Sequence, residues 1–446
     1  MSHTASKNID TTLNIRKVAL TALAGTSIEW YDFFLYGAAA ALIFPTAFFG
    51  EVSQSTALIL SLLTFAAGFI ARPIGGIIFG HFGDKIGRKK TLVIALILMG
   101  VASTLIGLLP TYAMIGVAAP IILTILRFAQ GLAIGGQWGG AMLLVTESAP
   151  ANQRGFYGAY AQAGVPIGVI LANLAYIITG SLMSDESFFI WGWRIPFLAS
   201  AVLIGLSMYI QLTMEDTKAF QELQSVRENQ QTNKKNNTEV KKSPIIEAIK
   251  KYPGRIALAA GAFLSVQVTF YILIAFMLAY GVTSAGMERD EMLFAVLIGS
   301  AIMTPALFFF SSYSDRNGRK GVFIMGAILT AIWAFALFPL VDTGNFWLSV
   351  LGITGGLVFL SMMYGPQAAF FTELFTTEVR YSGANLGYQT GAILGGAFAP
   401  TIATMLWTDF DIFWVSVYIA FASMLTVLSV MALSETYQSD LNQDIS

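Results

Sequence analysis

The sequence predicts an all-α membrane protein, with twelve transmembrane helices arranged as two pseudo-symmetric six-helix bundles. Three observations lead to this prediction: an apolar composition, a succession of long apolar stretches, and a repeat between the two halves of the chain. Of the 446 residues, 56% are hydrophobic and 11% are charged, and the mean hydropathy is +0.68. A soluble domain carries about 25% charged residues and could not bury this much apolar surface, so the bilayer must be the solvent.

The rest of the composition excludes several classes of protein. A net charge of −1 argues against a nucleic-acid partner. The chain contains no cysteine, which excludes disulfides, thiol catalysis and cysteine-based metal sites. It has neither a G-x-x-x-x-G-K-[ST] phosphate loop nor an H-E-x-x-H zinc motif. We therefore expect neither an ATPase nor another enzyme, and no cofactor.

Twelve apolar stretches of about 18–28 residues follow one another, and each is long enough to cross a hydrocarbon core of ~30 Å. The first residues of the chain are polar, and the first apolar run is a full span with no small-residue cleavage site after it. We therefore expect this run to be a helix rather than a removable signal. The expected spans are residues 18–42, 55–80, 91–110, 118–146, 155–181, 193–213, 254–281, 291–313, 322–341, 345–371, 383–407 and 412–434.

Basic residues are distributed very unevenly between the loops on the two sides. If the N-terminus is cytoplasmic, the outer loops contain Arg289 as their one basic residue. Lysine and arginine are retained on the cytoplasmic side of membrane proteins, so both termini are expected to be cytoplasmic. The inner loops hold the Lys-rich stretch 218–251 together with Arg16, Lys17, Lys85, Arg88, Lys89, Lys90, Arg154, Arg316, Arg319, Lys320 and Arg380.

One long polar segment, residues 215–251, lies almost at the midpoint of the chain. Its Gln, Asn and Lys content cannot build a core, so we interpret it as a cytoplasmic linker. The expected organisation is a first half over residues 1–214, the linker, a second half over 252–436 and a cytoplasmic tail over 437–446.

Two sequence echoes relate these halves. GDKIGRKK at 83–90 returns as SDRNGRKG at 314–321, each time after the second span of a half. The stretch from Glu147 to Arg154 returns as Glu373 to Arg380, each time after the fourth span. The two offsets, 231 and 226 residues, agree closely. Parallel repeats of this kind are a known plan for transporters, with the binding site near the membrane midplane.

Several motifs along the whole chain resemble the major facilitator superfamily. The resemblance is more specific to its metabolite–proton symporter branch, which includes bacterial shikimate, ketoglutarate, citrate and proline/betaine carriers. The motifs are GHFGDKIGRK at 80–89, EWYDF at 29–33 with Tyr36-Gly37, ARPIGG at 71–76, Arg127 with Gln130-Gly131, GWRIPF at 192–197, ELF at 373–375 and EVRY at 378–381.

This resemblance implies a secondary active transporter in the bacterial cytoplasmic (inner) membrane that carries a small organic acid together with protons. The expected partners are that acid, protons and the lipid bilayer, and the expected state is a monomer. Symport of a zwitterion such as proline or betaine, and proton-driven export, remain alternatives. In one departure, the branch's Gly-Gly-Glu-Trp-Gly-Gly has Gln137 at its third position, which removes a titratable acid.

Charged residues at membrane depth are the main candidates for chemistry, because each costs at least ~2.5 kcal/mol to insert. We expect Asp32 and Arg127, at similar depth, to form an ion pair. A nearby cation stabilises a carboxylate, so the proton affinity of Asp32 would change when the pair separates. Glu29 lies on nearly the same helix face as Asp32 and is a candidate proton relay. Arg72 and Arg127 could bind a substrate carboxylate through their planar guanidinium forks.

The second half offers no fixed charge at depth but several polar side chains that could hydrogen-bond a substrate. Packing between helices is the alternative role for each of them. The predicted substrate contacts besides the two arginines are Tyr36, Gln137, Gln267, Tyr271, Tyr364, Gln367, Asn385 and Gln389.

The charged loop motifs are expected to form a cytoplasmic latch that opens and closes during transport, with topogenic charge as the simpler alternative. An acidic side chain such as Asp84 could stabilise a helix N-terminus there. The predicted gating residues are Asp84, Arg88, Glu147, Arg154, Asp315, Arg319, Glu373 and Arg380.

Overall fold

The computed structural model describes residues 2–86, 88–135, 145–146, 149–215, 244–376 and 379–437. The regular structure in these ranges is helical, and each of the twelve predicted apolar stretches overlaps a helix. Nine of the described helices are long and apolar enough to cross a membrane. Of the fourth span, expected over 118–146, the structure describes residues 118–135 and 145–146.

The six long helices of the first half are joined by short helical turns. The turns are α2 (Phe44–Phe49), α5 (Tyr112–Ile115), α9 (Asp185–Ser187) and η2 (Phe188–Gly192). The long helices are α1 (Ser2–Leu42), α3 (Gln54–Ile86), α4 (Arg88–Leu108), α6 (Ala118–Gly135), α8 (Arg154–Ser181) and α10 (Arg194–Glu215).

The second half begins with the short helix α12 (Pro244–Lys251). Two of its spans are composite, since a π-helical segment interrupts each of them. These spans are α13 (Pro253–Tyr271) with η3 (Ile272–Phe276) and α14 (Met277–Thr283), and α18 (Arg380–Gly391) with η4 (Ala392–Ala397) and α19 (Ala399–Asp409). The other spans are α15 (Arg289–Asn317), α16 (Arg319–Asp342), α17 (Phe346–Glu373) and α20 (Ile412–Ala432).

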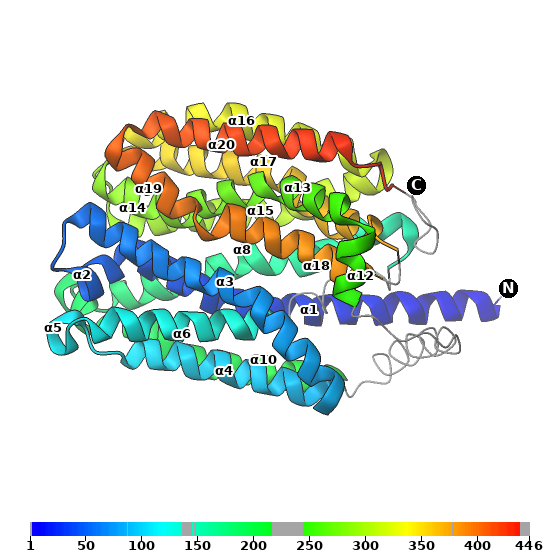
Figure 1. Cartoon of the computed structure of the whole chain (residues 1–446), viewed down its shortest axis with the longest axis horizontal. Coiled ribbons are helices and arrows are strands. Elements are labelled where there is room, and N and C mark those ends of the chain that lie inside the picture. The colour runs from blue at the N-terminus through cyan, green and yellow to red at the C-terminus, as the bar shows by residue number, and fades with distance from the viewer. Residues whose placement is uncertain are drawn as a thin grey trace.

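The two halves lie side by side with their long helices roughly parallel, and the N-terminus and the end of the described chain lie at the same end of the bundle (Figure 1). Helix α8 packs on α1 of its own half and on α15 and α17 of the other half. Helix α3 contacts the second half through η4 and α19. The interface between the halves is therefore built mainly by α1, α3 and α8 on one side.

Two features of the helices differ from the sequence-based expectation. Helix α1 begins at Ser2 rather than near residue 18, because adding turns to an existing helix costs little once it is nucleated. The π segments η3 and η4 were not expected, since the apolar periodicity of their spans continues through them. Such segments widen one helical turn and commonly occur at functional sites.

Glycines allow α3 and α6 to pack backbone against backbone. A Cβ atom on Gly131 would lie 2.1 Å from the carbonyl oxygen of Gly68, and one on Gly135 would lie 1.9 Å from that of Arg72. A side chain at either position would force the helices apart. The close contact brings Arg72 of α3 and Arg127 of α6 into one region of the first half.

We predict that Gly131→Ala lowers stability strongly, because the new methyl group meets rigid backbone. The loss should be at least the 1–3 kcal/mol or so that is typical of an over-packed core. This loss of stability is measured by thermal unfolding in detergent, with size-exclusion chromatography as the readout of the folded fraction. Gly205→Ala on α10 is the matched control, since no atom lies within 4 Å of a Cβ there. Equal melting temperatures for the two variants would contradict the close-packing argument.

Candidate functional site

The two arginines of the first half are both buried and both stack on the ring of Phe33. The Cζ atom of Arg72 lies 4.3 Å from the Phe33 ring centroid, and that of Arg127 lies 4.0 Å from it. Phe69 and Trp30 complete the aromatic surroundings of Arg72, at 4.4 and 5.1 Å. The electron-rich ring faces offset part of the cost of burying each cation, by ~2 kcal/mol or more where water is excluded.

The guanidinium groups retain unused hydrogen-bonding capacity. The Nε and Nη2 atoms of both Arg72 and Arg127 are buried and have no hydrogen-bond partner in the described structure. Tyr36, a predicted substrate contact, lies 4.3 Å from the Arg127 Cζ atom, and its hydroxyl pairs with Thr64 at 2.6 Å. Tyr36 therefore belongs to the surroundings of the arginine.

The predicted ion pair between Asp32 and Arg127 is wrong in its direct form, because Gln130 stands between the two side chains. Arg127 Nη1 donates to Gln130 Oε1 at 3.1 Å, and Gln130 Nε2 donates to Asp32 Oδ2 at 3.0 Å. Ser103 of α4 also donates to Asp32 Oδ2. The other carboxylate oxygen, Oδ1, is buried without a partner among the described residues. Nothing in the sequence indicated Ser103 as a site residue, and Gln130 stood out there only as part of a motif.

The remaining charged residues of the first half have different surroundings. Glu29, the candidate proton relay, is partly exposed, and its side chain has a hydrogen-bonding or electrostatic partner. Arg194 donates to the carbonyl oxygens of Gly107 and Leu109, at 3.1 and 2.6 Å. Because Gly107 lies in the last turn of α4, Arg194 satisfies carbonyls that have no partner within that helix.

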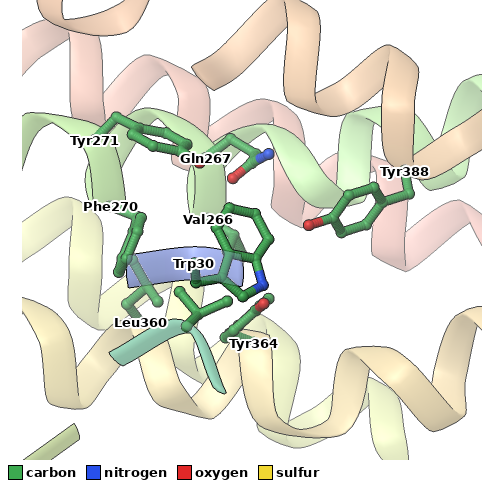
Figure 2. A pocket seen from close by; sticks show the side chains of 9 residues that line it. Trp30, Val266, Gln267, Phe270, Tyr271, Leu360, Tyr364 and Tyr388 are labelled. Atoms are coloured by element: carbon green, nitrogen blue, oxygen red, sulfur yellow. The ribbon is translucent and has the colours of Figure 1, made fainter. Parts of the chain in front are cut away.

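A small central cavity of about 10 Å³, roughly the room of one water molecule, lies between the halves (Figure 2). Three predicted contacts, Gln267, Tyr271 and Tyr364, line it together with Tyr388. The hydroxyls of Tyr364 and Tyr388 point toward the space beside Trp30 in Figure 2. Neither arginine lines the cavity directly, but both Trp30 and Tyr271 do, and Arg72 stacks on Trp30. The lining residues that the sequence analysis did not propose are Trp30, Val165, Val266, Phe270 and Leu360.

Four amide side chains of the second half also retain unpaired polar atoms. Each contributes one buried atom without a partner in the part of the chain that the structure describes. The atoms are Gln267 Nε2, Gln367 Oε1, Asn385 Oδ1 and Gln389 Oε1. Of these residues, Gln267 lines the cavity. Unpaired buried polar atoms cost free energy, so they commonly mark places where a ligand or water binds.

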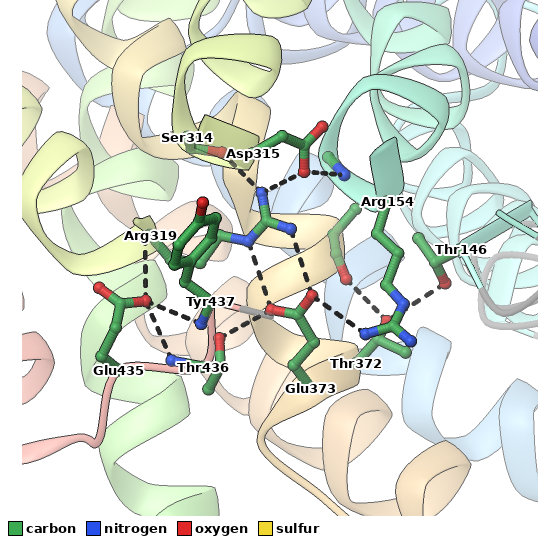
Figure 3. A network of polar contacts seen from close by, with 12 residues as sticks. Thr146, Arg154, Ser314, Asp315, Arg319, Thr372, Glu373, Glu435, Thr436 and Tyr437 are labelled. Carbon is green, nitrogen blue, oxygen red and sulfur yellow. Dashed lines mark hydrogen bonds and ion pairs between the residues drawn. The ribbon is translucent and has the colours of Figure 1, made fainter. Parts of the chain in front are cut away.

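At the end of the bundle that holds both termini, charged residues join the halves (Figure 3). Asp315 of α15 accepts hydrogen bonds from the backbone N–H groups of Gly155 and Phe156, each at 2.8 Å. Those groups belong to the first turn of α8, where the helix dipole favours an anion. Asp315 also pairs with Arg319 at 2.7 Å. It thus connects two helices of the second half to one of the first.

Glu373 of α17 forms the second part of this contact. Arg319 donates to it from two nitrogens, at 3.2 and 3.3 Å, and Arg154 of α8 lies 3.7 Å away. Thr436 also donates to Glu373, at 2.8 Å. We call Arg154, Asp315, Arg319 and Glu373 the charge latch.

The other predicted gating residues fall into two groups. Arg380 donates to the carbonyl oxygens of Thr372 and Phe375, at 3.0 and 3.2 Å, within its own half. For Asp84 and Arg88 the structure describes the helical backbone alone. Glu147 lies outside the described residues, as does Gln137, the predicted substrate contact.

The opposite end of the interface is also closed. Arg289, which begins α15, pairs with Asp185 of the first half at 3.3 Å and stacks on Phe188 at 4.1 Å. Nearby, Asn173 of α8 donates to the carbonyl of Leu293 at 3.2 Å. With the charge latch at one end and Arg289 at the other, the halves touch on both sides of the central cavity. No group of three or more His, Cys, Asp or Glu side chains that could hold a metal ion is found in the described ranges.

Comparison with known proteins identifies the fold and the family. Residues 17–443 match the family described as "Sugar (and other) transporter". The chain belongs to the sugar (and other) transporter family. It is therefore a membrane transporter rather than an enzyme.

Individual relatives within this family cover almost the whole chain. The inner membrane metabolite transport protein YhjE of Escherichia coli is 37% identical, with 97% of each chain covered. The shikimate transporter of E. coli is 36% identical over 95% of each chain. The proline/betaine transporter of E. coli is 31% identical, over 88% of this chain and 78% of its own.

Solved structures identify the fold as that of the major facilitator superfamily, with twelve transmembrane helices. A D-xylose-proton symporter matches with a TM-score of 0.73 and 18% identity, covering 95% of this chain and 99% of its own. A partially occluded, inward open conformation of the E. coli xylose transporter XylE matches with a TM-score of 0.69. The predicted superfamily, its metabolite-carrier relatives and the twelve-helix fold are thus confirmed.

We predict that Asp315→Asn loosens the end of this transporter that the charge latch closes. The substitution removes the negative charge from hydrogen bonds that are worth about 1.5–3 kcal/mol each. The chain has no cysteine, so an Ala368→Cys reporter, buried beside Gly158 of α8, can be labelled alone. Its reaction with a maleimide in detergent should become at least about tenfold faster. Asp409→Asn at the end of α19 is the control, and an unchanged rate in Asp315→Asn would rule out the latch.

Proposed function

We propose that this transporter carries a small organic acid together with protons by alternating access. The observation that carries the proposal is a charge imbalance beside the central cavity. Arg72 and Arg127 are both buried, whereas Asp32 is the buried carboxylate of the first half in the described chain. A buried charge without compensation is costly, so a substrate carboxylate would supply the missing negative charge.

The unpaired guanidinium atoms support a carboxylate as the recognised group. Arginine presents a planar set of N–H donors that matches the two oxygens of a carboxylate. The amide and tyrosine side chains of the second half provide partners for hydroxyl or carbonyl groups on the rest of the substrate. This combination of groups fits the class of acid to which shikimate belongs, and a similar protein is named a shikimate transporter.

A net anion fits this site better than a zwitterion. A zwitterion such as proline or betaine brings its own cation, and the excess of positive charge beside Phe33 would remain. The aromatic rings of the site could bind such a cation, but those of Phe33, Phe69 and Trp30 are already stacked on arginine. The 31% identical proline/betaine transporter keeps this substrate class as the alternative to be tested.

Asp32 is the proposed proton site, because it is buried and one of its oxygens has no partner. Protonation would remove the one buried negative charge near Arg127 and leave the arginine free to attract a substrate anion. Proton and acid would then enter together, which is symport. Glu29, three residues earlier on α1, is the proposed relay to the cavity.

The halves would alternate between opening at the charge latch and opening at Arg289. We place the charge latch on the cytoplasmic side, because lysine and arginine concentrate at that end of the sequence-predicted topology. The 37% identical relative is named an inner membrane protein, which supports the bacterial cytoplasmic membrane as the location.

We predict that purified protein in liposomes acidifies the lumen when shikimate is added outside. A pH-sensitive dye reports the proton, and ketoglutarate, citrate, benzoate, proline and betaine complete the panel. Asp32→Asn should abolish acidification, since it removes the proton site, whereas Asp409→Asn should not. Acidification by betaine or proline in place of the acids would favour the zwitterion. Labelled acid entering without protons would overturn proton symport and point to sodium coupling or facilitated diffusion.

We predict separately that Arg127→Lys and Arg72→Lys raise the KM for the transported acid about tenfold or more. Lysine keeps the charge but loses the planar fork and its stacking on the rings. Initial rates of labelled uptake across substrate concentrations measure the change. Arg194→Lys is the matched buried control, because Arg194 contacts backbone carbonyls outside the site and should leave KM unchanged. A KM that stays at the wild-type value in both site variants would contradict anion binding by this pair.

A further inference from the structure

Gln130 occupies an unusual position between the two charged residues of the proposed coupling site. It is fully buried on α6, one helical turn after Arg127. Its amide oxygen accepts from Arg127 at 3.1 Å, and its amide nitrogen donates to Asp32 at 3.0 Å and to Ser103 at 2.7 Å. Both ends of this one side chain are therefore used by the two charged groups.

The chemistry of the partners fixes the orientation of this amide. Arginine has donors only, so the oxygen of Gln130 must face Arg127, and an ionised carboxylate has acceptors only, so the nitrogen must face Asp32. A reversed amide would lose both contacts. Arg127 thus fixes the orientation of Gln130, and the amide nitrogen always faces the carboxyl group of Asp32.

We propose that Gln130 is a positioning residue that couples the protonation of Asp32 to the availability of Arg127 for a substrate anion. As a spacer, it keeps the two charges from forming a direct ion pair. A direct pair would occupy the guanidinium group that the anion needs. As a link, its amide group bonds to both charged residues, so a change in the charge of Asp32 affects the hydrogen bonding of Arg127. This inference rests on the proposed function.

The proposed sequence needs one proton and breaks no covalent bond. When Asp32 takes up a proton, its hydrogen bonds from Gln130 and Ser103 lose their charge assistance, which roughly halves their strength. The amide is then held less firmly, and Arg127 loses its nearby counter-charge. A substrate carboxylate can then replace both the amide oxygen of Gln130 and the lost negative charge as partners of Arg127. The reverse order, with the anion first, leaves Asp32 ionised and two negative charges around one arginine.

Besides Glu29, one turn earlier on α1, few ionisable groups of the described chain surround Asp32. Arg127 faces it from α6, Tyr31 from its own helix and Tyr176 from α8. The hydroxyls of both tyrosines donate to backbone carbonyls, of Pro196 at 2.9 Å and of Leu35 at 3.1 Å. Helices α4 and α10 present Ser103 and Ser200, which do not ionise. The amide of Gln130 is therefore the direct connection between Asp32 and the cation.

The test compares Gln130→Met, which keeps the volume and removes both hydrogen bonds, with wild type. We expect Gln130→Met to exchange labelled shikimate across the liposome membrane while the number of protons carried per shikimate falls at least twofold. Gln162→Met is the matched control, because buried Gln162 donates to the carbonyl of Tyr364 at 3.3 Å and contacts neither Asp32 nor Arg127. An unchanged proton ratio in Gln130→Met would overturn the inference.

A second measurement needs no transport and separates this inference from the proposed function. The infrared band of the protonated Asp32 carboxyl, identified by its loss in Asp32→Asn, is followed as a function of pH in purified protein. Gln130→Met should raise the proton affinity of Asp32 roughly tenfold, because the lost amide hydrogen bond stabilises the ionised carboxylate. A tenfold change is the value expected for one lost hydrogen bond to a charged group. Ser103→Ala should act in the same direction, and Ser423→Ala, a buried serine contact between α13 and α20, should not. If wild type moves no shikimate, the proposed substrate fails; if the band titrates identically in Gln130→Met, the role of Gln130 fails.

Discussion

The placement of two arginines inside the first half is the constraint on which the rest of the site depends. An arginine at this depth must be compensated by partners that a lipid environment does not supply. The protein meets this need with the ring of Phe33, on which both guanidinium groups stack, and with the carboxylate of Asp32, which reaches Arg127 through Gln130. The rings lower the cost of burial without using up the N–H donors. Compensation by further carboxylates would have been more complete and would have left nothing for a substrate to bind.

The fold provides this arrangement through close helix packing. Glycines at the contact of α3 and α6 let the two backbones touch. This close contact brings Arg72 of α3 and Arg127 of α6 into the same region. At the ends of the interface the situation is different, because charged side chains bridge the halves. The charge latch is buried, whereas Asp185, the partner of Arg289 at the other end, is exposed, and such an ion pair is weak on its own. A close-packed centre with polar bridges between the halves at both ends suits a protein whose halves must move around a fixed site.

Much of this architecture could be predicted from the sequence, since apolar length, the internal repeat and the basic loops are properties of the chain alone. The residues of the charge latch were recognisable for the same reason, because Asp315 and Glu373 repeat motifs of the first half. The link through Gln130 was not predictable. A pair of opposite charges at equal depth suggests direct contact, and nothing in the sequence shows which neutral side chain lies between them. The lining of the cavity by Trp30 and Phe270 was not predictable, because 13% of the residues are aromatic and most of them pack between helices.

The π segments of the second half have a geometric consequence. A π turn holds one residue more than an α turn, so the helical stretches on its two sides are out of phase by about 100°. On α13, Tyr271 faces the rings of Phe69 and Phe65, and beyond η3 the hydroxyl of Tyr280 donates to Asp342 of α16. One continuous span thus presents two different faces along its length, the inner one to the partner half and the outer one to its own bundle.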